Sequence, residues 1–323
     1  MKDPGGMNGI LPVLPHLRKM QIKPVIFGTG KAAELLPGRM PAYTTQRRFF
    51  RVTTANDIMR LHAQLGSGSA NPFAVLTSMC SEGGAGRDII PLMRAMKIRT
   101  IAYQDFWGAR LKTDWQDVKY RPDAICVGNR YAAELVTRAW SEYDPARVKI
   151  TGFTTHDQYA NYDADSAVIE TTRDLHLDDK PVVFYLIENI SGAGRVTKDL
   201  IEVMNGLGSE INLVAHYHPR MGTSVPEEIP ECEKALGAFR AGRLIRTEKD
   251  LPYADIQRYL AASSLVVAMW STILVEASLF RKDALAIMYP DIGIKHFQGE
   301  MGGQMDQVPV VALRAAHQAE SKE

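Results

Sequence analysis

Residues 265–290, LVVAMWSTILVEASLFRKDALAIMYP, decide the fold that we expect for this chain. An apolar run is followed by Trp270-Ser271-Thr272, by apolar residues at helical spacing and by a second apolar run. This order predicts a strand, a turn, a helix and another strand. Ser271 and Thr272 would stand where the helix begins, so that their hydroxyls and the backbone N–H groups converge. A phosphate site is one interpretation of that arrangement, and an ordinary helix cap is the other.

The composition is that of an ordinary globular protein. A length of 323 residues suggests two domains, and 46% hydrophobic residues supply enough apolar side chains for two cores. The net charge of +1 gives no indication of nucleic-acid binding. No apolar run approaches the roughly 20 residues of a membrane span, and the start lacks the apolar region of a signal peptide. Cys80, Cys126 and Cys232 form no metal-ligand pair or disulfide framework, so we expect reduced thiols and a cytoplasmic protein.

Strands alternate with helices along most of the chain, which is typical of parallel βαβ units in doubly wound sheets. The expected strands lie at 24–27, 49–53, 73–77, 99–103, 124–127, 148–151, 182–187, 211–215, 243–246, 265–269, 284–288 and 308–313. A polar stretch at 156–180, with one helix near 166–175, interrupts the pattern. We therefore expect an α/β fold of two Rossmann-like domains, 1–155 and 181–323, which face each other across a cleft and are joined by a crossing linker at 156–180.

The N-terminus begins with a glycine-rich stretch, residues 3–9, before an expected helix at 10–20. The N–H groups of such a loop can hold an anion or a sugar around Gly5, Gly6 and Asn8. A flexible chain end is the alternative. Because such a loop normally follows a strand, we also expect a further strand before residue 1.

Ligands of doubly wound sheets bind beyond the carboxyl ends of the strands, so the loops there are the candidate sites. In the first half, Glu82 and Asp105 follow strands and are candidate general bases, although turn or cap carboxylates are common there. Trp107 is either a platform on which a sugar stacks or a packing residue. Arg130 follows the strand at 124–127.

In the second half, a glycine turn and a basic pair follow two expected strands. The turn Ser191-Gly192-Ala193-Gly194-Arg195 lacks the Gly-Lys-Ser/Thr ending of a P-loop, yet its glycines would let a ligand approach the backbone. The sequence His218-Pro219-Arg220 places an imidazole and a guanidinium together, which suits an anionic oxygen. Glu276, about one turn into the last expected helix, would reach a ribose or sugar hydroxyl, or else be solvated.

The second half resembles the nucleotide-binding domain of GT-B glycosyltransferases, of non-hydrolysing UDP-N-acetylglucosamine 2-epimerases and of CDP-glycerol glycerophosphotransferases. The resemblance covers nearly the whole chain in layout. It implies that the donor's phosphate is held by His218, Ser271 and Thr272. The residues that carry it are His218-Pro219-Arg220, Leu251-Pro252-Tyr253, Ser271-Thr272 with Glu276, and Lys149-Ile150-Thr151-Gly152-Phe153 at the end of the first domain.

The sequence also departs from these families. Where the epimerases carry Gly-Thr-Arg-Pro-Glu, this chain has Asp3-Pro4-Gly5-Gly6, and their first-domain carboxylate set is not recognisable. Bacterial sialyltransferases of this fold use an acidic-Asp-Gly base motif, of which Asp105-Phe106-Trp107-Gly108 is a loose analogue. These departures favour a transferase over an epimerase.

We therefore expect a GT-B glycosyltransferase of cell-envelope polysaccharide synthesis, which moves a glycosyl or polyol-phosphate group from a nucleotide-activated donor to an acceptor hydroxyl. It would need no cofactor and no metal, and its partners would be the nucleotide sugar and the acceptor, with membrane-surface association left open. The alternatives are a nucleotide-sugar 2-epimerase-like isomerase and an inactive nucleotide-sugar-binding protein. Catalysis would involve Asp105, with Glu82 as substitute base, and His218. The expected donor site is Ser191, Gly192, Gly194, Arg195, Arg220, Ser271, Thr272 and Glu276, and the expected acceptor site is Gly5, Gly6, Asn8, Trp107 and Arg130.

Overall fold

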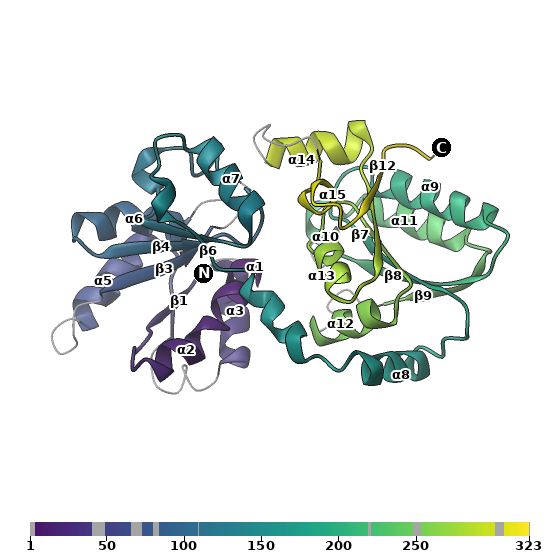
Figure 1. The fold of residues 1–323 in the computed structure, drawn as a ribbon, viewed down its shortest axis with the longest axis horizontal. Helices are drawn as coiled ribbons and strands as arrows, with labels where there is room; N and C mark the ends of the chain where they lie inside the picture. The colour runs from purple at the N-terminus through teal and green to yellow at the C-terminus, as the bar shows by residue number, and fades with distance from the viewer. Residues whose placement is uncertain are drawn as a thin grey trace. The chain divides into compact units, whose positions relative to one another are not determined.

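The chain forms two compact units, each built around parallel sheet (Figure 1). The structure is a computed structural model, and it describes residues 4–40, 49–65, 73–79, 84–108, 110–218, 221–247, 253–300 and 307–322. The first unit runs to Ala160, and the second runs from Asn161 to Gly299 and includes residues 307–322. The division falls inside the stretch 156–180 that the sequence suggested as a linker.

The first unit contains a four-stranded parallel sheet in the order β3-β4-β5-β6 and a separate parallel pair, β1-β2. Its strands are β1 (Ile26–Gly28), β2 (Phe49–Arg51), β3 (Ala74–Ser78), β4 (Arg99–Tyr103), β5 (Ala124–Val127) and β6 (Val148–Ile150). Its helices are α1 (Pro4–Ile10), α2 (Val13–Lys19), α3 (Gly30–Arg39), α5 (Ala55–Leu65), α6 (Ala85–Ala95) and α7 (Arg130–Ala139), with short turns η1 (Val118–Tyr120) and η2 (Pro145–Arg147). The turn η3 (Thr154–Asn161) leads into the second unit.

The glycine-rich N-terminal stretch is helical from residue 4, so the prediction of a loop there is wrong. Met7 is fully buried and joins a small apolar cluster with residues of α2, β1 and α3. Gly9 lies so close to β4 that a side-chain carbon there would stand 2.0 Å from the Tyr103 ring. Packing of this kind outweighs the low helix propensity of glycine.

The second unit contains one six-stranded parallel sheet in the order β12-β11-β10-β7-β8-β9. Its strands are β7 (Val182–Ile187), β8 (Ile211–Tyr217), β9 (Gly242–Arg246), β10 (Leu265–Ala268), β11 (Asp283–Ile287) and β12 (His317–Ala319). Its helices are α8 (Ala164–Asp174), α9 (Ala193–Gly206), α10 (Met221–Ser224), α11 (Glu228–Gly237), α12 (Tyr253–Ala262), α13 (Ile273–Leu279), η4 (Pro290–Ile294), α14 (Lys295–Glu300) and α15 (Pro309–Ala312).

Strand order in the second unit defines where a ligand would bind. Every residue of β7 and β8 is buried, as expected for central strands of a parallel sheet covered on both faces. Figure 1 shows α9 and α11 on one side of this sheet and α12 and α13 on the other. The chain starts at β7, proceeds outward through β8 to β9, and then returns to β10 on the other side of β7. The order therefore reverses between β7 and β10, which is the binding position of dinucleotide-binding sheets.

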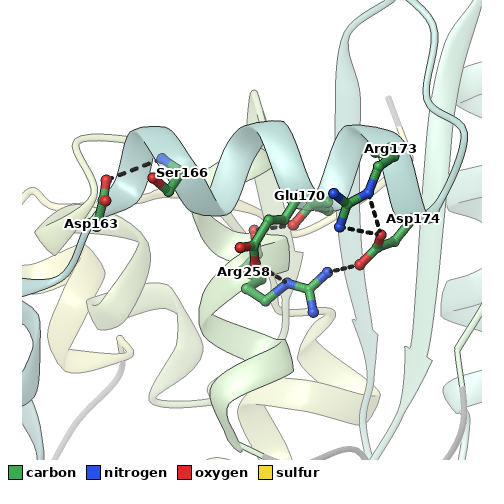
Figure 2. Close-up of polar contacts among 7 residues, drawn as sticks. Asp163, Ser166, Glu170, Arg173, Asp174 and Arg258 are labelled. Atoms are coloured by element: carbon green, nitrogen blue, oxygen red, sulfur yellow. Dashed lines mark hydrogen bonds and ion pairs between the residues drawn. The ribbon is translucent and has the colours of Figure 1, made fainter.

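Helix α8 is attached to the second unit by α12 (Figure 2). The Arg258 guanidinium lies 2.5 Å from an Asp174 oxygen, and the buried Thr171 hydroxyl donates to the Arg258 carbonyl. At the other end of α8, an Asp163 oxygen accepts the Ser166 N–H at 3.1 Å. Although Asp163-Ala164-Asp165 is an Asp-X-Asp triplet, a pattern that would suggest a metal-dependent transferase, Asp163 serves here as a helix cap.

The C-terminal strand also differs from its prediction. Residues 308–313 were expected to be a strand, but Pro309–Ala312 form α15, whereas β12 at His317–Ala319 pairs with β11. A short apolar run does not distinguish a strand from a buried helical turn. The proline at the start of α15 suits a first helical position.

Candidate functional site

Glu188 occupies the point in the second unit where the strand order reverses. It follows β7 directly, and one of its carboxylate oxygens accepts the Ser271 N–H at 3.1 Å. The backbone of Trp270 and of Met269 also lowers the pKa of this carboxyl group. One acidic side chain therefore connects the end of β7 with the turn that follows β10.

Burial dominates the chemistry of Glu188. Its side chain is 6% exposed. Desolvation raises its pKa from 4.5 to about 7, while the three backbone N–H groups oppose the rise. Glu188 is therefore a carboxyl group that exchanges a proton near neutral pH.

His218 and the Ser271-Thr272 pair follow β8 and β10, the two strands on either side of β7, after which Glu188 lies. The backbone N–H of His218 donates to the Ile187 carbonyl at 2.9 Å, which places the half-buried histidine beside the end of β7. Ser271 and Thr272 lie between β10 and α13, and both are half-buried. The Ser271 hydroxyl accepts the Ile273 N–H at 3.3 Å, so it caps the turn locally. Histidine, serine and threonine side chains thus lie at one edge of the sheet.

Two further side chains border this edge. Trp270, which is half-buried, stacks on His296 of α14 with ring centroids 5.0 Å apart and an angle of 14°. Glu276 is only 5% exposed on α13, so a solvated glutamate, the alternative that the sequence allowed, is wrong.

The glycine turn after β7 has a partner of its own. Glu228 of α11 accepts the N–H groups of Gly192 and Gly194 at 2.6 and 2.8 Å. Arg195 pairs with Asp291 at 2.7 Å. Ser191 is exposed at the start of the turn. The donors that the sequence assigned to a phosphate are therefore already bound to carboxylates of the chain.

In the first unit, Asp105 lies after β4 and is half-exposed. Trp107 is 2% exposed and packs edge-on against Phe106 and Phe153 at 5.3 and 5.1 Å, so it is a packing residue and presents no open stacking face. Between β4 and Asp105, the Gln104 side-chain amide is 1% exposed, and neither of its polar atoms has a hydrogen-bond partner among the described residues. Buried amides normally have partners, so this position can accommodate a polar group.

The other predicted acceptor residues lie at separate places in the first unit. Gly5, Gly6 and Asn8 belong to α1, and an Asn8 oxygen accepts from Arg39 at 2.6 Å. Helix α1 does reach the end of β4, since Gly9 lies against the Tyr103 ring. The Thr154 hydroxyl of η3 also donates to the Gly9 carbonyl. Arg130 is exposed and lines a 520 Å³ surface hollow formed by α7 and β6, which Asp105 and Trp107 do not line.

Glu82 and Arg220 lie outside the described residues. Sequence reasoning did not identify Glu188 or Glu228. A signal for Glu188 was present, because an acidic residue directly after a continuous apolar strand is a candidate at the carboxyl end of a sheet. Glu228 had no such signal, because it lies in a polar stretch far from the glycines that it binds.

The described ranges contain no candidate metal centre and no candidate membrane span. No group of three or more His, Cys, Asp or Glu residues within them is arranged to hold a metal ion. None of the helices within them is long and apolar enough to cross a membrane.

Solved structures of two related classes share this fold. UDP-GlcNAc 2-epimerase from Methanocaldococcus jannaschii matches with a TM-score of 0.64 at 10% identity, over 99% of this chain and 88% of its own. UDP-GlcNAc 2-epimerase from Neisseria meningitidis, bound to UDP-GlcNAc, matches with 0.58 at 13% identity, over 88% and 80%. A glycosyltransferase from Rickettsia africae matches with 0.61 at 8% identity, over 98% and 81%.

These likenesses confirm the predicted fold class. The chain has two Rossmann-like α/β units and shares the fold of the GT-B glycosyltransferases and UDP-GlcNAc 2-epimerases. No protein-family model matches the sequence, and no curated protein matches it.

Proposed function

We propose that the protein is a transferase that moves a glycosyl or polyol-phosphate group from a nucleotide-activated donor to an acceptor hydroxyl. The observation that carries this proposal is the group of side chains where the second sheet reverses its order: His218 after β8, Glu188 after β7, and Ser271 with Thr272 after β10. Sheets of this order bind nucleotides at that point. The Neisseria epimerase of the same fold is bound to UDP-GlcNAc.

In this proposal, the donor's phosphate contacts the Ser271 and Thr272 hydroxyls and the His218 imidazole. Histidine and hydroxyl donors stabilise the negative charge that develops on the leaving phosphate. Asp105 of the first unit takes the proton of the acceptor hydroxyl. We further propose that the reaction uses no metal or other cofactor and occurs in the cytoplasm.

Incubation of the purified protein with UDP-GlcNAc or UDP-glucose tests the proposal. A transferase releases the nucleoside diphosphate only when a suitable acceptor is present, which NMR or chromatography detects. Equilibration of UDP-GlcNAc with a new isomer in the absence of acceptor would replace the transferase with an epimerase, whose fold this chain also shares. Nucleotide-sugar binding without turnover on any donor–acceptor pair would indicate a binding protein.

A further inference from the structure

Glu188 occupies N–H donors that an anionic ligand at the same position would need. The Ser271 backbone N–H donates to its carboxylate at 3.1 Å, and the backbone of Trp270 and Met269 also favours its charged form. Backbone N–H groups of a turn can bind an anion. The turn therefore already binds an anion, and that anion is a side chain of the protein.

We propose that the phosphate of a nucleotide sugar binds at this turn beside Glu188, and that the Glu188 carboxylate takes up one proton from solvent as the phosphate binds. The inference rests on the proposed function, which places the donor's phosphate at Ser271. It assigns Glu188 the role of a positioning residue that couples donor binding to pH.

Electrostatic repulsion couples the binding of a phosphate to the protonation of Glu188. Two anions a few ångströms apart in a site that excludes water repel each other strongly. Protonation removes the charge of Glu188 while leaving the group in place as an acid that can donate to a phosphate oxygen. A carboxyl already half-protonated near neutral pH accepts the proton at small cost. The proton balance is simple: a solvent proton adds to a carboxylate oxygen, and no other bond changes.

Three other titratable side chains lie near Glu188. Tyr185 on β7 is electrostatically coupled to Glu188, but burial raises its pKa far above neutrality. His218 after β8 and Glu276 on α13 are the other titratable side chains at this edge. Protonation of His218 would also strengthen phosphate binding at low pH, so the test has to separate His218 from Glu188.

The test measures the affinity for UDP-glucose between pH 6.5 and 8.5, because the diphosphate of this ligand does not change its charge in that range. With a Glu188 pKa of about 7 in the free protein, we expect binding to be roughly tenfold weaker at pH 8.5 than at pH 7. Calorimetry at pH 8 in two buffers of different ionisation enthalpy should show uptake of nearly one proton per ligand.

Glu188→Gln keeps the shape and an acceptor oxygen but cannot ionise. We expect the variant to bind UDP-glucose at pH 8.5 at least tenfold more tightly than the wild type, with no proton uptake at pH 8. Glu233→Gln is the matched control: it makes the same change on a half-buried carboxylate of α11, which accepts the Tyr217 hydroxyl, and should keep the wild-type pH dependence. Proton uptake that persists in Glu188→Gln would assign the coupling to His218 and overturn the proposal.

Other outcomes are equally decisive. If Glu188→Gln does not fold, the two-buffer calorimetry on the wild type still decides, since binding without proton uptake overturns the inference. Binding of UDP-glucose with pH-independent affinity contradicts the role of Glu188 but leaves the proposed function intact. Failure of the wild type to bind UDP-glucose or UDP-GlcNAc at any pH contradicts both.

Discussion

Glu188 should make the folded protein less stable as the pH rises, even without a ligand. Its pKa increases from 4.5 to about 7 on folding, so the folded state binds the proton more tightly than the unfolded state. Stability from this group is fully present below pH 4.5 and is lost as the pH rises towards 7. At ~1.4 kcal/mol per pKa unit, the total loss is about 3 kcal/mol, of which about 2–3 kcal/mol falls between pH 5 and pH 8. This free-energy change is not reduced for screening by solvent, because the Glu188 side chain is buried.

The assay is urea unfolding of the wild type and Glu188→Gln at pH 5, 6, 7 and 8. All other titrating groups are shared, so their contributions cancel in the difference between the two proteins. We expect the wild type to lose about 2–3 kcal/mol relative to the variant over this range. A difference in stability that does not change with pH would refute the reasoning, because Glu188 would then have the same pKa in the folded and unfolded chains. A difference that grows in favour of the wild type as the pH rises would also refute it, because the folded-state pKa would then be the lower one.

Four further outcomes follow from the site and from α8. Ser271→Ala combined with Thr272→Ala should weaken UDP-sugar binding by ~1–3 kcal/mol in calorimetry, the scale of hydrogen bonds to a charged group, and unchanged affinity in a folded variant would remove this pair from the site. His218→Ala should lower turnover more than it lowers the melting temperature; a variant that loses stability but keeps its specific activity makes His218 structural. Asp105→Asn should reduce turnover by ~10²–10⁴-fold with donor affinity retained, and full activity would place the base elsewhere. Arg258→Ala should destabilise the protein by about 1 kcal/mol, since it removes an ion pair that is partly exposed, and an unchanged unfolding midpoint would mean that this pair contributes nothing.

The central strand β7 could be predicted from the sequence because burial on both faces leaves an unbroken apolar run. The expected bounds 99–103, 124–127 and 182–187 are those of β4, β5 and β7. Parallel strands place their carboxyl ends at one edge of the sheet, so the edge at which His218 and Ser271 lie was also predictable. Local patterns therefore identified the strands and the side of the sheet that carries the site.

Local patterns failed where a distant partner decides the structure. The short helix α1 exists because Met7 and Gly9 pack against elements far along the chain, and the glycines alone favour a loop. Glu188 is separated from Ser271 by 83 residues, and Glu228 from Gly194 by 34. Nothing in the sequence near either turn shows that its N–H donors have an internal acceptor.

Glu188 and Glu228 both accept backbone N–H groups of a turn, but the surroundings of the two carboxylates differ. At the turn after β7, Gly194 packs so tightly on α11 that a side-chain carbon there would lie 2.5 Å from Glu231, and Gly192 meets Ile292 in the same way at 2.8 Å. Glu228 therefore lies where α9 and α11 are in close contact, and its carboxylate caps the turn between β7 and α9. Glu188, in contrast, can lose its charge near neutral pH without moving. Of the two phosphate positions that the sequence suggested, the one at Ser271 is therefore the one that the proposed function uses.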